Sequence, residues 1–230
     1  MTSPTIVIAT PHGRNDLLER RVRDQLSDHH VVRLHARQDM SSETLAQIKP
    51  DFVFFPHWSW LIPEEIHSRF DCVIFHMTDL PYGRGGSPLQ NLIVRGHQET
   101  MMSALKCVKD FDAGPVYLKR LLSLAGTAEE ILQRASALIE KMIVEIVEKR
   151  SIPVPQQGDV VEFKRRQVKD GDLAPLLELS QVYDYIRMLD AEGYPPAFFK
   201  TEHLHVEFSD ARLGKEFVEA KVRIRKKTNE

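Results

Sequence analysis

Short apolar segments of strand length alternate with helical segments over the first 76 residues, and this alternation constrains the fold most strongly. The expected strands are 5–10, 30–35, 52–55 and 72–75, and the expected helices between them are 15–26, 42–48 and 63–70. Strands that are apolar on both faces are typical of sheets covered by helices on both sides. A strand–helix–strand connection places the two strands parallel. The sequence therefore predicts an α/β fold with a Rossmann-like, mainly parallel sheet.

The second half of the chain contains one strong helix and then a change of pattern. A helix is expected at 87–94, extended segments at 101–108 and 115–122, and the clearest helix at 127–148, where Thr127 and Glu130 form a capping box. The proline-rich stretch 153–155 indicates a linker, and a helix at 179–188 precedes short strands at 198–201, 204–208 and 218–224. We therefore expect a main domain over residues 1–152 and a small C-terminal α+β, antiparallel subdomain over residues 153–230.

Composition limits the classes of partner and compartment. The 31 Lys and Arg residues nearly balance the 33 Asp and Glu residues, for a net charge of −2, which argues against a nucleic-acid partner. The sequence contains neither an apolar run long enough to span a bilayer nor a secretory signal, so we expect a cytoplasmic protein without a membrane partner. Cys72 and Cys107 lie in apolar surroundings and are interpreted as buried thiols.

Three groups of polar or small residues are candidates for a binding site. His203 and His205 share a strand face, but a third ligand at metal spacing is missing, so no metal is expected. The run 83–86 (Gly-Arg-Gly-Gly) fits neither a dinucleotide fingerprint nor a phosphate-binding P-loop, and both a ligand loop and a plain connection remain open. The turn 11–14 (Pro-His-Gly-Arg) precedes a helix, where an anion site and an ordinary turn are both open.

His76 lies where a buried strand ends, which is the usual position of functional residues in an open α/β sheet. The run 76–88 (His-Met-Thr-Asp-Leu-Pro-Tyr-Gly-Arg-Gly-Gly-Ser-Pro) is followed by Gly96, Glu99-Thr100 and the triplet 112–114 (Asp-Ala-Gly). In order and spacing, this pattern resembles the formyltransferases that use 10-formyltetrahydrofolate. The resemblance covers about residues 50–150 and implies the formyltransferase fold, with residues 1–152 as the catalytic domain.

The resemblance also suggests a branch of the family. Segments 183–187 and 193–199 resemble the region after the catalytic domain in sugar-nucleotide N-formyltransferases. Methionyl-tRNA formyltransferase carries a larger basic C-terminal domain, and glycinamide ribonucleotide transformylase ends soon after the catalytic domain. We therefore expect transfer of a formyl group from 10-formyltetrahydrofolate to the amine of an amino-deoxy sugar, with a nucleotide-linked acceptor and a role in surface-glycan (lipopolysaccharide or O-antigen) synthesis.

The same resemblance assigns roles to individual residues. His76 is expected to act as general base or donor, with Asp112 orienting its ring. The residues expected to bind folate are His57, Trp58, Ser59, Trp60, Ile62 and Asp112, and those expected to bind substrate are His12, Gly13, Arg14, Arg84, Gly85 and Tyr194. The C-terminal subdomain is expected to contribute to substrate binding or dimerisation. An edge near residues 218–224 leaves a dimer and a covered edge equally open.

Ile74 departs from the family pattern, which has an asparagine two residues before the histidine. Strand alternation places Ile74 and His76 on one face, so the substitution points into the site. Loss of one oxyanion donor costs about 2.7–4 kcal/mol of transition-state stabilisation. Thr78, His57 or Asn91 could replace the donor. The alternatives are a slow enzyme in which Ile74 desolvates His76 and keeps it neutral as a base, a catalytically impaired paralogue that binds folate or a nucleotide sugar, and a formyltetrahydrofolate hydrolase.

Overall fold

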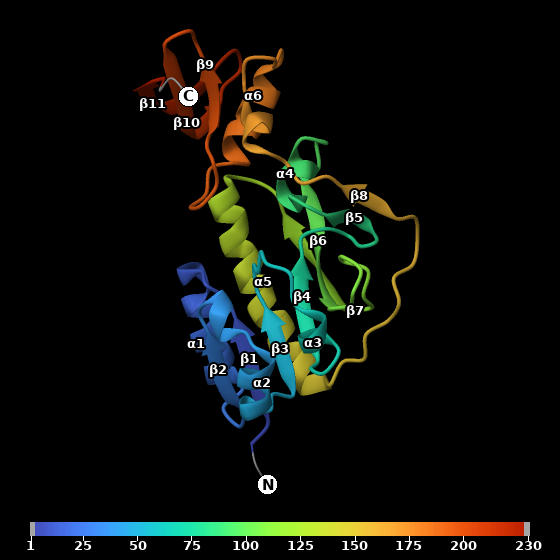
Figure 1. The fold of residues 1–230 in the computed structure, drawn as a ribbon. Helices are drawn as coiled ribbons and strands as arrows, with labels where there is room; N and C mark the ends of the chain where they lie inside the picture. Colours follow the sequence, from blue (N-terminus) through green and yellow to red (C-terminus); the bar gives the residue numbers. More distant parts are fainter. Residues whose placement is uncertain (1–2, 228–230) are drawn as a thin grey trace. The chain divides into compact units, whose positions relative to one another are not determined.

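The computed structural model describes residues 3–227 and divides the chain into two compact units (Figure 1). The first unit contains the chain up to Gly85, together with Met101–Leu122 and Gln133–Glu162. The second unit contains Gly86–Thr100, Ser123–Leu132 and the chain from Phe163 onward. The predicted domain boundary between residues 152 and 153 stays a prediction.

A six-stranded sheet forms the centre of the first unit, in the order β2-β1-β3-β4-β6-β7. Its strands are β1 Thr5–Ala9, β2 His30–Leu34, β3 Phe52–Phe55, β4 Cys72–His76, β6 Glu99–Lys106 and β7 Val116–Ser123. The first four strands pair in parallel, and β6 pairs antiparallel with β4. The predicted α/β fold with a mainly parallel sheet is therefore confirmed.

Helices complete this unit by covering the apolar strands. They are α1 Asp16–Gln25, α2 Ser42–Ile48, α3 Glu64–His67 and most of α5 Ala128–Lys149. Leu45 of α2 and Ile66 of α3 pack in one core cluster with strand residues Val7, Val53 and Phe55. The α1 helix lies beside α5, because Arg21 and Gln25 of α1 both contact the buried carboxylate of Glu140, at 3.4 and 3.0 Å. Helices α2 and α3 therefore cover apolar residues of the sheet.

The second unit contains α4 Pro88–Ile93, α6 Leu179–Arg187 and a three-stranded antiparallel sheet. The sheet has the order β11-β10-β9, with β9 at Ala197–Lys200, β10 at Leu204–Leu213 and β11 at Val218–Lys226. Its small core is formed by Leu173, Ile186 and Ala197. The predicted antiparallel C-terminal subdomain is confirmed, and β11 is an edge strand of this sheet.

The sequence did not predict strand β5. Residues Tyr82–Gly85 form β5, which pairs with β8 Val161–Phe163 in a two-stranded sheet. Two of the four β5 residues are glycines with φ of 79° and 100°, values that favour glycine and are typical of turns. Long-range pairing therefore creates this strand. None of the helices within residues 3–227 is long and apolar enough to cross a membrane.

The reciprocal capping box at the start of α5 generates a stability prediction. The Thr127 backbone N–H donates to Glu130 Oε2 at 2.8 Å, and the Glu130 N–H donates to Thr127 Oγ1 at 3.3 Å. Replacing Thr127 by alanine should lower the free energy of unfolding by about 1 kcal/mol, because one N–H of the first turn loses its acceptor. Urea unfolding measures this difference. Ser180→Ala, at an exposed position of α6, is the control, and an equal effect of the two changes would contradict the prediction.

Candidate active site

His76 ends strand β4 and is buried, with 8% of its surface exposed. Its ring atom Nε2 lies 2.7 Å from the carbonyl oxygen of Gly83. A carbonyl oxygen only accepts hydrogen bonds, so Nε2 carries the proton of this bond. The Thr78 hydroxyl donates to the same carbonyl at 3.4 Å. The ring is therefore fixed by main-chain geometry, and its other nitrogen, Nδ1, is directed elsewhere.

The carboxylate of Asp112 faces that second nitrogen. Its Oδ1 lies 3.5 Å from His76 Nδ1, and its Oδ2 accepts a hydrogen bond from the Gly85 backbone N–H at 2.9 Å. Strand β5 thus holds both side chains, His76 through Gly83 and Asp112 through Gly85. Asp112 has a φ of 51°, a left-handed conformation that aspartate adopts more readily than most residues. The structure brings the two predicted catalytic residues together as an imidazole–carboxylate pair, and their catalytic role stays a prediction.

Ile74 packs against the apolar cluster of the first unit and lies opposite Leu105 in the sheet. Of the three predicted replacement donors, only Thr78 shares a bonding partner with His76. His57 is bonded to Ser136. The Asn91 amide group donates to the carbonyl oxygens of Gly86 and Lys164, both at 2.9 Å, within the second unit.

His57 belongs to a chain of polar side chains in the first unit. Its Nε2 lies 3.1 Å from Ser136 Oγ, and that hydroxyl donates to Asn15 Oδ1 at 2.8 Å. Because the Ser136 hydroxyl donates its proton to Asn15, it can only accept from His57, so His57 Nε2 carries a proton and donates it to Ser136. Burial, together with the smaller effect of the neighbouring positive charge of Arg14, lowers the pKa of His57 to about 3. His57 is therefore neutral near pH 7.

The residues predicted to bind folate form an aromatic group next to β3. Trp58 packs edge-to-face on Phe55 and on Trp60, with ring centroids 5.5 and 4.8 Å apart. Trp58 Nε1 is buried and has no hydrogen-bond partner within the described part of the chain. Ile62 is buried in the same cluster, and Ser59 is exposed. The group therefore combines ring surfaces with one unsatisfied donor.

The residues predicted to bind substrate fall in both units. His12, Gly13 and Arg14 follow strand β1 in the first unit, and Tyr194 belongs to the second. The backbone N–H of Gly85 already donates to Asp112 Oδ2. Arg84 donates to Gln156 Oε1 from Nε at 3.2 Å and from Nη2 at 2.8 Å. Among residues 3–227, no group of three or more His, Cys, Asp or Glu side chains is arranged to hold a metal ion.

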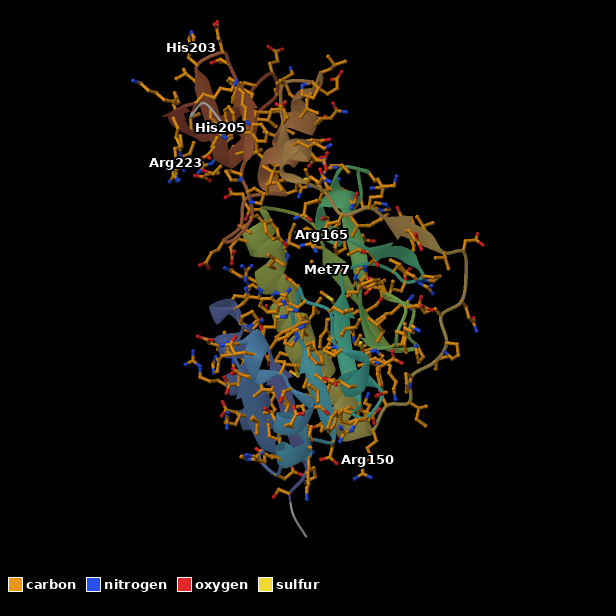
Figure 2. The ribbon with its side chains drawn as sticks, viewed as in Figure 1. Met77, Arg150, Arg165, His203, His205 and Arg223 are labelled. Atoms are coloured by element: carbon orange, nitrogen blue, oxygen red, sulfur yellow. The ribbon has the colours of Figure 1, made fainter. Side chains whose placement is uncertain are left out.

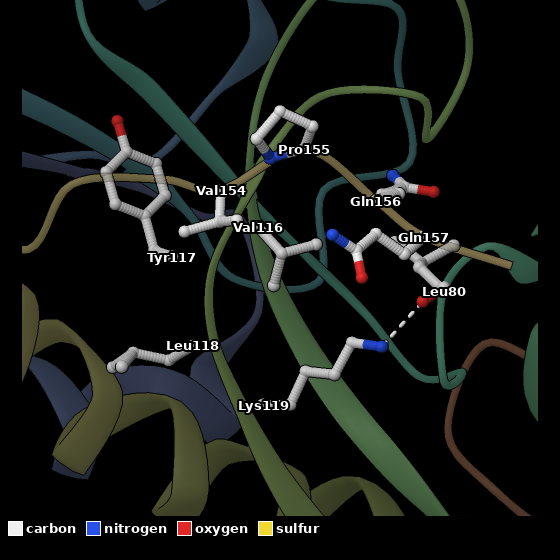
Figure 3. A pocket seen from close by; sticks show the side chains of 9 residues that line it. All are labelled: Leu80, Val116, Tyr117, Leu118, Lys119, Val154, Pro155, Gln156 and Gln157. Atoms are coloured by element: carbon white, nitrogen blue, oxygen red, sulfur yellow. Dashed lines mark hydrogen bonds between the residues drawn. The ribbon is translucent and has the colours of Figure 1, made fainter.

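A cavity of about 330 Å³ lies between β7 and the segment 154–157 (Figure 3). The Lys119 side chain lines it and donates to the Leu80 carbonyl at 2.5 Å, as drawn in Figure 3. None of the residues predicted as site residues lines this cavity. Two residues that bond to the predicted site had no signal of their own in the sequence. Gly83 belongs to the glycine-rich run 83–86, and Gln156 directly follows the predicted linker 153–155.

Comparisons with known proteins identify the relatives of this chain. Residues 168–225 match the family described as the C-terminal domain of methionyl-tRNA formyltransferase. The solved structure of a methionyl-tRNA formyltransferase from Clostridium thermocellum is 43% identical, covers 97% of this chain and 100% of its own, and superposes with a TM-score of 0.94.

Curated relatives carry the same name. The methionyl-tRNA formyltransferase of Wolbachia pipientis is 24% identical over 77% of this chain, and that of Thermotoga maritima is 31% identical over 59%. The chain spans 60% and 43% of the length of these two relatives. HypX of Aquifex aeolicus in complex with tetrahydrofolic acid shares the fold, with a TM-score of 0.73 at 19% identity.

The predicted amino-sugar acceptor is wrong. A 4-N formyltransferase from Francisella tularensis shares only the fold, at 15% identity, whereas the relatives with the higher identities are named for methionyl-tRNA. The segments read as sugar-enzyme features, 183–187 and 193–199, lie within the residues that match the methionyl-tRNA formyltransferase domain. The predicted role in lipopolysaccharide synthesis depended on a sugar acceptor and is therefore not supported.

The expectation of no nucleic-acid partner is also wrong, because these relatives are named for a tRNA substrate. It rested on the net charge of the whole chain, which averages over local differences. Strand β11 and the residue after it carry five basic side chains and one acidic residue, Glu219. A 58-residue match also shows that a short chain can contain a domain of this type.

The lowered pKa of His57 generates a prediction about acid stability. The unfolded chain binds a proton at this residue below about pH 6.5, whereas the folded chain does so only near pH 3, so the stability contribution is lost as the pH falls between these values. His57→Asn keeps a residue that tolerates the φ of 53° and removes the titrating group. Between pH 7.5 and 5.0, the variant should lose about 1–2 kcal/mol less unfolding free energy than the wild type.

Chemical denaturation at the two pH values measures this difference. His203→Asn is the matched control, because 80% of the His203 side chain is exposed (labelled in Figure 2). The control should follow the wild type. Equal pH dependence of His57→Asn and the wild type would show that the ring takes up its proton in the folded state as readily as in the unfolded state.

Proposed function

The chain belongs to the formyltransferase family, and from this premise we propose that it transfers the formyl group of 10-formyltetrahydrofolate to the amino group of methionyl-tRNA. The observation that carries the proposal is the 43% identity, over 97% of this chain and 100% of the other, to a protein named for this activity. The pairing of His76 with Asp112 at the end of β4 supports it independently.

The imidazole–carboxylate pair is suited to moving the proton that the reaction releases. When bound, the folate supplies an activated formyl group, and an attacking amine must lose a proton. His76 Nε2 keeps its proton on the Gly83 carbonyl, so Nδ1 is the atom that accepts the proton of the amine. A proton held at Nδ1 is carried by the ring atom that lies 3.5 Å from Asp112 Oδ1, and the carboxylate stabilises the positive charge of the ring.

The aromatic group next to β3 fits a flat heteroaromatic ring such as the pterin of folate. Trp60 is 36% exposed and lies against Trp58, whose buried Nε1 lacks an acceptor within residues 3–227. A buried donor without a partner costs about 1–3 kcal/mol, and a polar ring edge can satisfy it. We therefore assign Trp58 and Trp60 to the donor side of the reaction.

The C-terminal sheet supports an RNA acceptor. Strand β11 exposes Lys221, Arg223, Arg225 and Lys226 at the edge of the sheet, and Figure 2 labels Arg223 there. Lys221 and Arg225 also contact Asp210 and Glu207, at 2.9 and 3.2 Å, so part of this charge is balanced within the sheet. Arginine and lysine on an exposed strand can contact phosphates, and such binding weakens as the salt concentration rises.

The test is direct. The purified chain is incubated with 10-formyltetrahydrofolate and methionyl-tRNA, and N-formylmethionine is measured by mass after the ester bond is hydrolysed. The wild type should form the product, and His76→Ala should lower the rate by roughly 10²–10⁴-fold because the proton acceptor is removed. His35→Ala, at an exposed position, should keep the wild-type rate. A wild type that forms no N-formylmethionine would overturn the proposed function.

Ile74 generates a second prediction. An amide at this position would face the same side of β4 as His76 and could donate to the formyl oxygen, on which negative charge develops. Ile74→Asn should therefore raise kcat, by up to about 10²-fold, the value of one such donor. Ile74→Leu is the control that changes shape without adding a donor, and it should not raise kcat.

The measurement is the single-turnover rate with both substrates saturating, together with the melting temperature, since an amide in an apolar cluster lowers stability. An unchanged rate in folded Ile74→Asn would mean that the charge on the formyl oxygen is already stabilised by another group. Thr78 would be the first to examine, because its buried hydroxyl shares the Gly83 carbonyl with His76.

A further inference from the structure

Gln156 lies outside the imidazole–carboxylate pair but is bonded to the loop that carries Asp112. Its position is set two residues earlier, where Val154 and Val116 of β7 exchange backbone hydrogen bonds of 2.9 and 2.8 Å. Figure 3 shows Gln156 and Gln157 following Val154 along one side of the cavity. The residue is therefore anchored to the sheet and directed towards the Asp112 loop.

The amide of Gln156 makes four hydrogen bonds. Its Nε2 donates to the carbonyl oxygens of Asp112 and Gly114, at 2.7 and 2.8 Å. Its Oε1 accepts from Arg84 Nε and Nη2, at 3.2 and 2.8 Å. Two donor hydrogens and two acceptor sites are the full capacity of a primary amide. The side chain is thus held in one orientation and bridges the Asp112 loop to Arg84.

The loop needs such support because its backbone is constrained. Asp112 has a left-handed φ of 51°, which is uncommon outside glycine. On the other side of the loop, a Cβ built on Gly114 would lie 1.8 Å from the Lys106 carbonyl oxygen, so the chain passes directly against β6. The loop is therefore fixed between β6 and the Gln156 amide, and this placement directs the Asp112 carboxylate towards His76.

We propose that Gln156 is a positioning residue for formyl transfer, which holds the Asp112 loop and the Arg84 side chain in the arrangement where the carboxylate faces the His76 ring. The inference rests on the proposed function and adds a residue to it. Arg84 and Asp112 are on different segments of the first unit, and one side chain sets the spacing of both.

Two substitutions separate the two ends of the bridge. Gln156→Met removes all four hydrogen bonds at similar size, so kcat should fall roughly tenfold or more and the KM for methionyl-tRNA should rise. Gln156→Glu keeps an acceptor for Arg84 but directs a carboxylate at two carbonyl oxygens, so kcat should fall with KM unchanged. Gln157→Met is the matched control, since Gln157 is the exposed neighbour on the same cavity, and it should leave both parameters unchanged.

A second measurement does not depend on activity. The ¹⁵N chemical shifts of the His76 ring are assigned by comparison with His76→Ala. These shifts should change in Gln156→Met, because the Asp112 carboxylate moves relative to Nδ1, and they should not change in Gln157→Met. Similar melting temperatures of the two methionine variants would show that the chain is folded.

The outcomes are distinct. A wild type that transfers no formyl group overturns the proposed function, and the NMR comparison alone then decides whether Gln156 positions Asp112. Wild-type kcat and wild-type His76 shifts in Gln156→Met would overturn the positioning role, whatever the substrate.

Discussion

The candidate site depends on two main-chain atoms of strand β5. The Gly83 carbonyl holds one nitrogen of His76, and the Gly85 N–H holds one oxygen of Asp112. These atoms are two residues apart on a short strand, so the separation of the two side chains is set by backbone geometry. The strand itself exists only because it pairs with β8, which follows the linker after α5. Residues far from His76 in sequence therefore determine how its ring is presented.

The elements that carry periodic apolar patterns were predictable from the sequence, and the support of the site was not. Strand β3 at Phe52–Phe55 and helix α2 at Ser42–Ile48 match their predicted ranges, because burial on regular faces leaves a pattern along the chain. Strand β5 leaves none, since glycines at positive φ are typical of loops and only long-range pairing makes them a strand. Gln156 was hidden for a similar reason, because a polar residue in a proline-rich stretch has the same composition whether or not it makes tertiary contacts.

A nucleic-acid partner was excluded wrongly because a chain-wide quantity was applied to a local question. A net charge of −2 describes the sum over 230 residues, whereas binding to phosphates depends on the charge of one surface. The basic residues of β11 occupy one edge strand, where Asp210 and Glu207 of the neighbouring strand balance only part of their charge. The larger C-terminal domain expected of methionyl-tRNA formyltransferase was also misleading, because 58 residues of this chain match that domain.

Hydrogen bonds to main-chain atoms also explain how the His76–Asp112 pair keeps its arrangement beside Ile74, where the family pattern has asparagine. Ile74 occupies the face of β4 that His76 shares, yet neither hydrogen bond that holds the pair to β5 involves its side chain. In the proposed mechanism, a substitution at position 74 therefore changes what faces the formyl carbonyl without loosening the His76 ring. A site held by side chains would couple these two properties, since removal of one partner would release the other. In the proposed mechanism, oxyanion stabilisation and proton transfer can therefore vary separately, and the placement of the Asp112 loop affects only proton transfer.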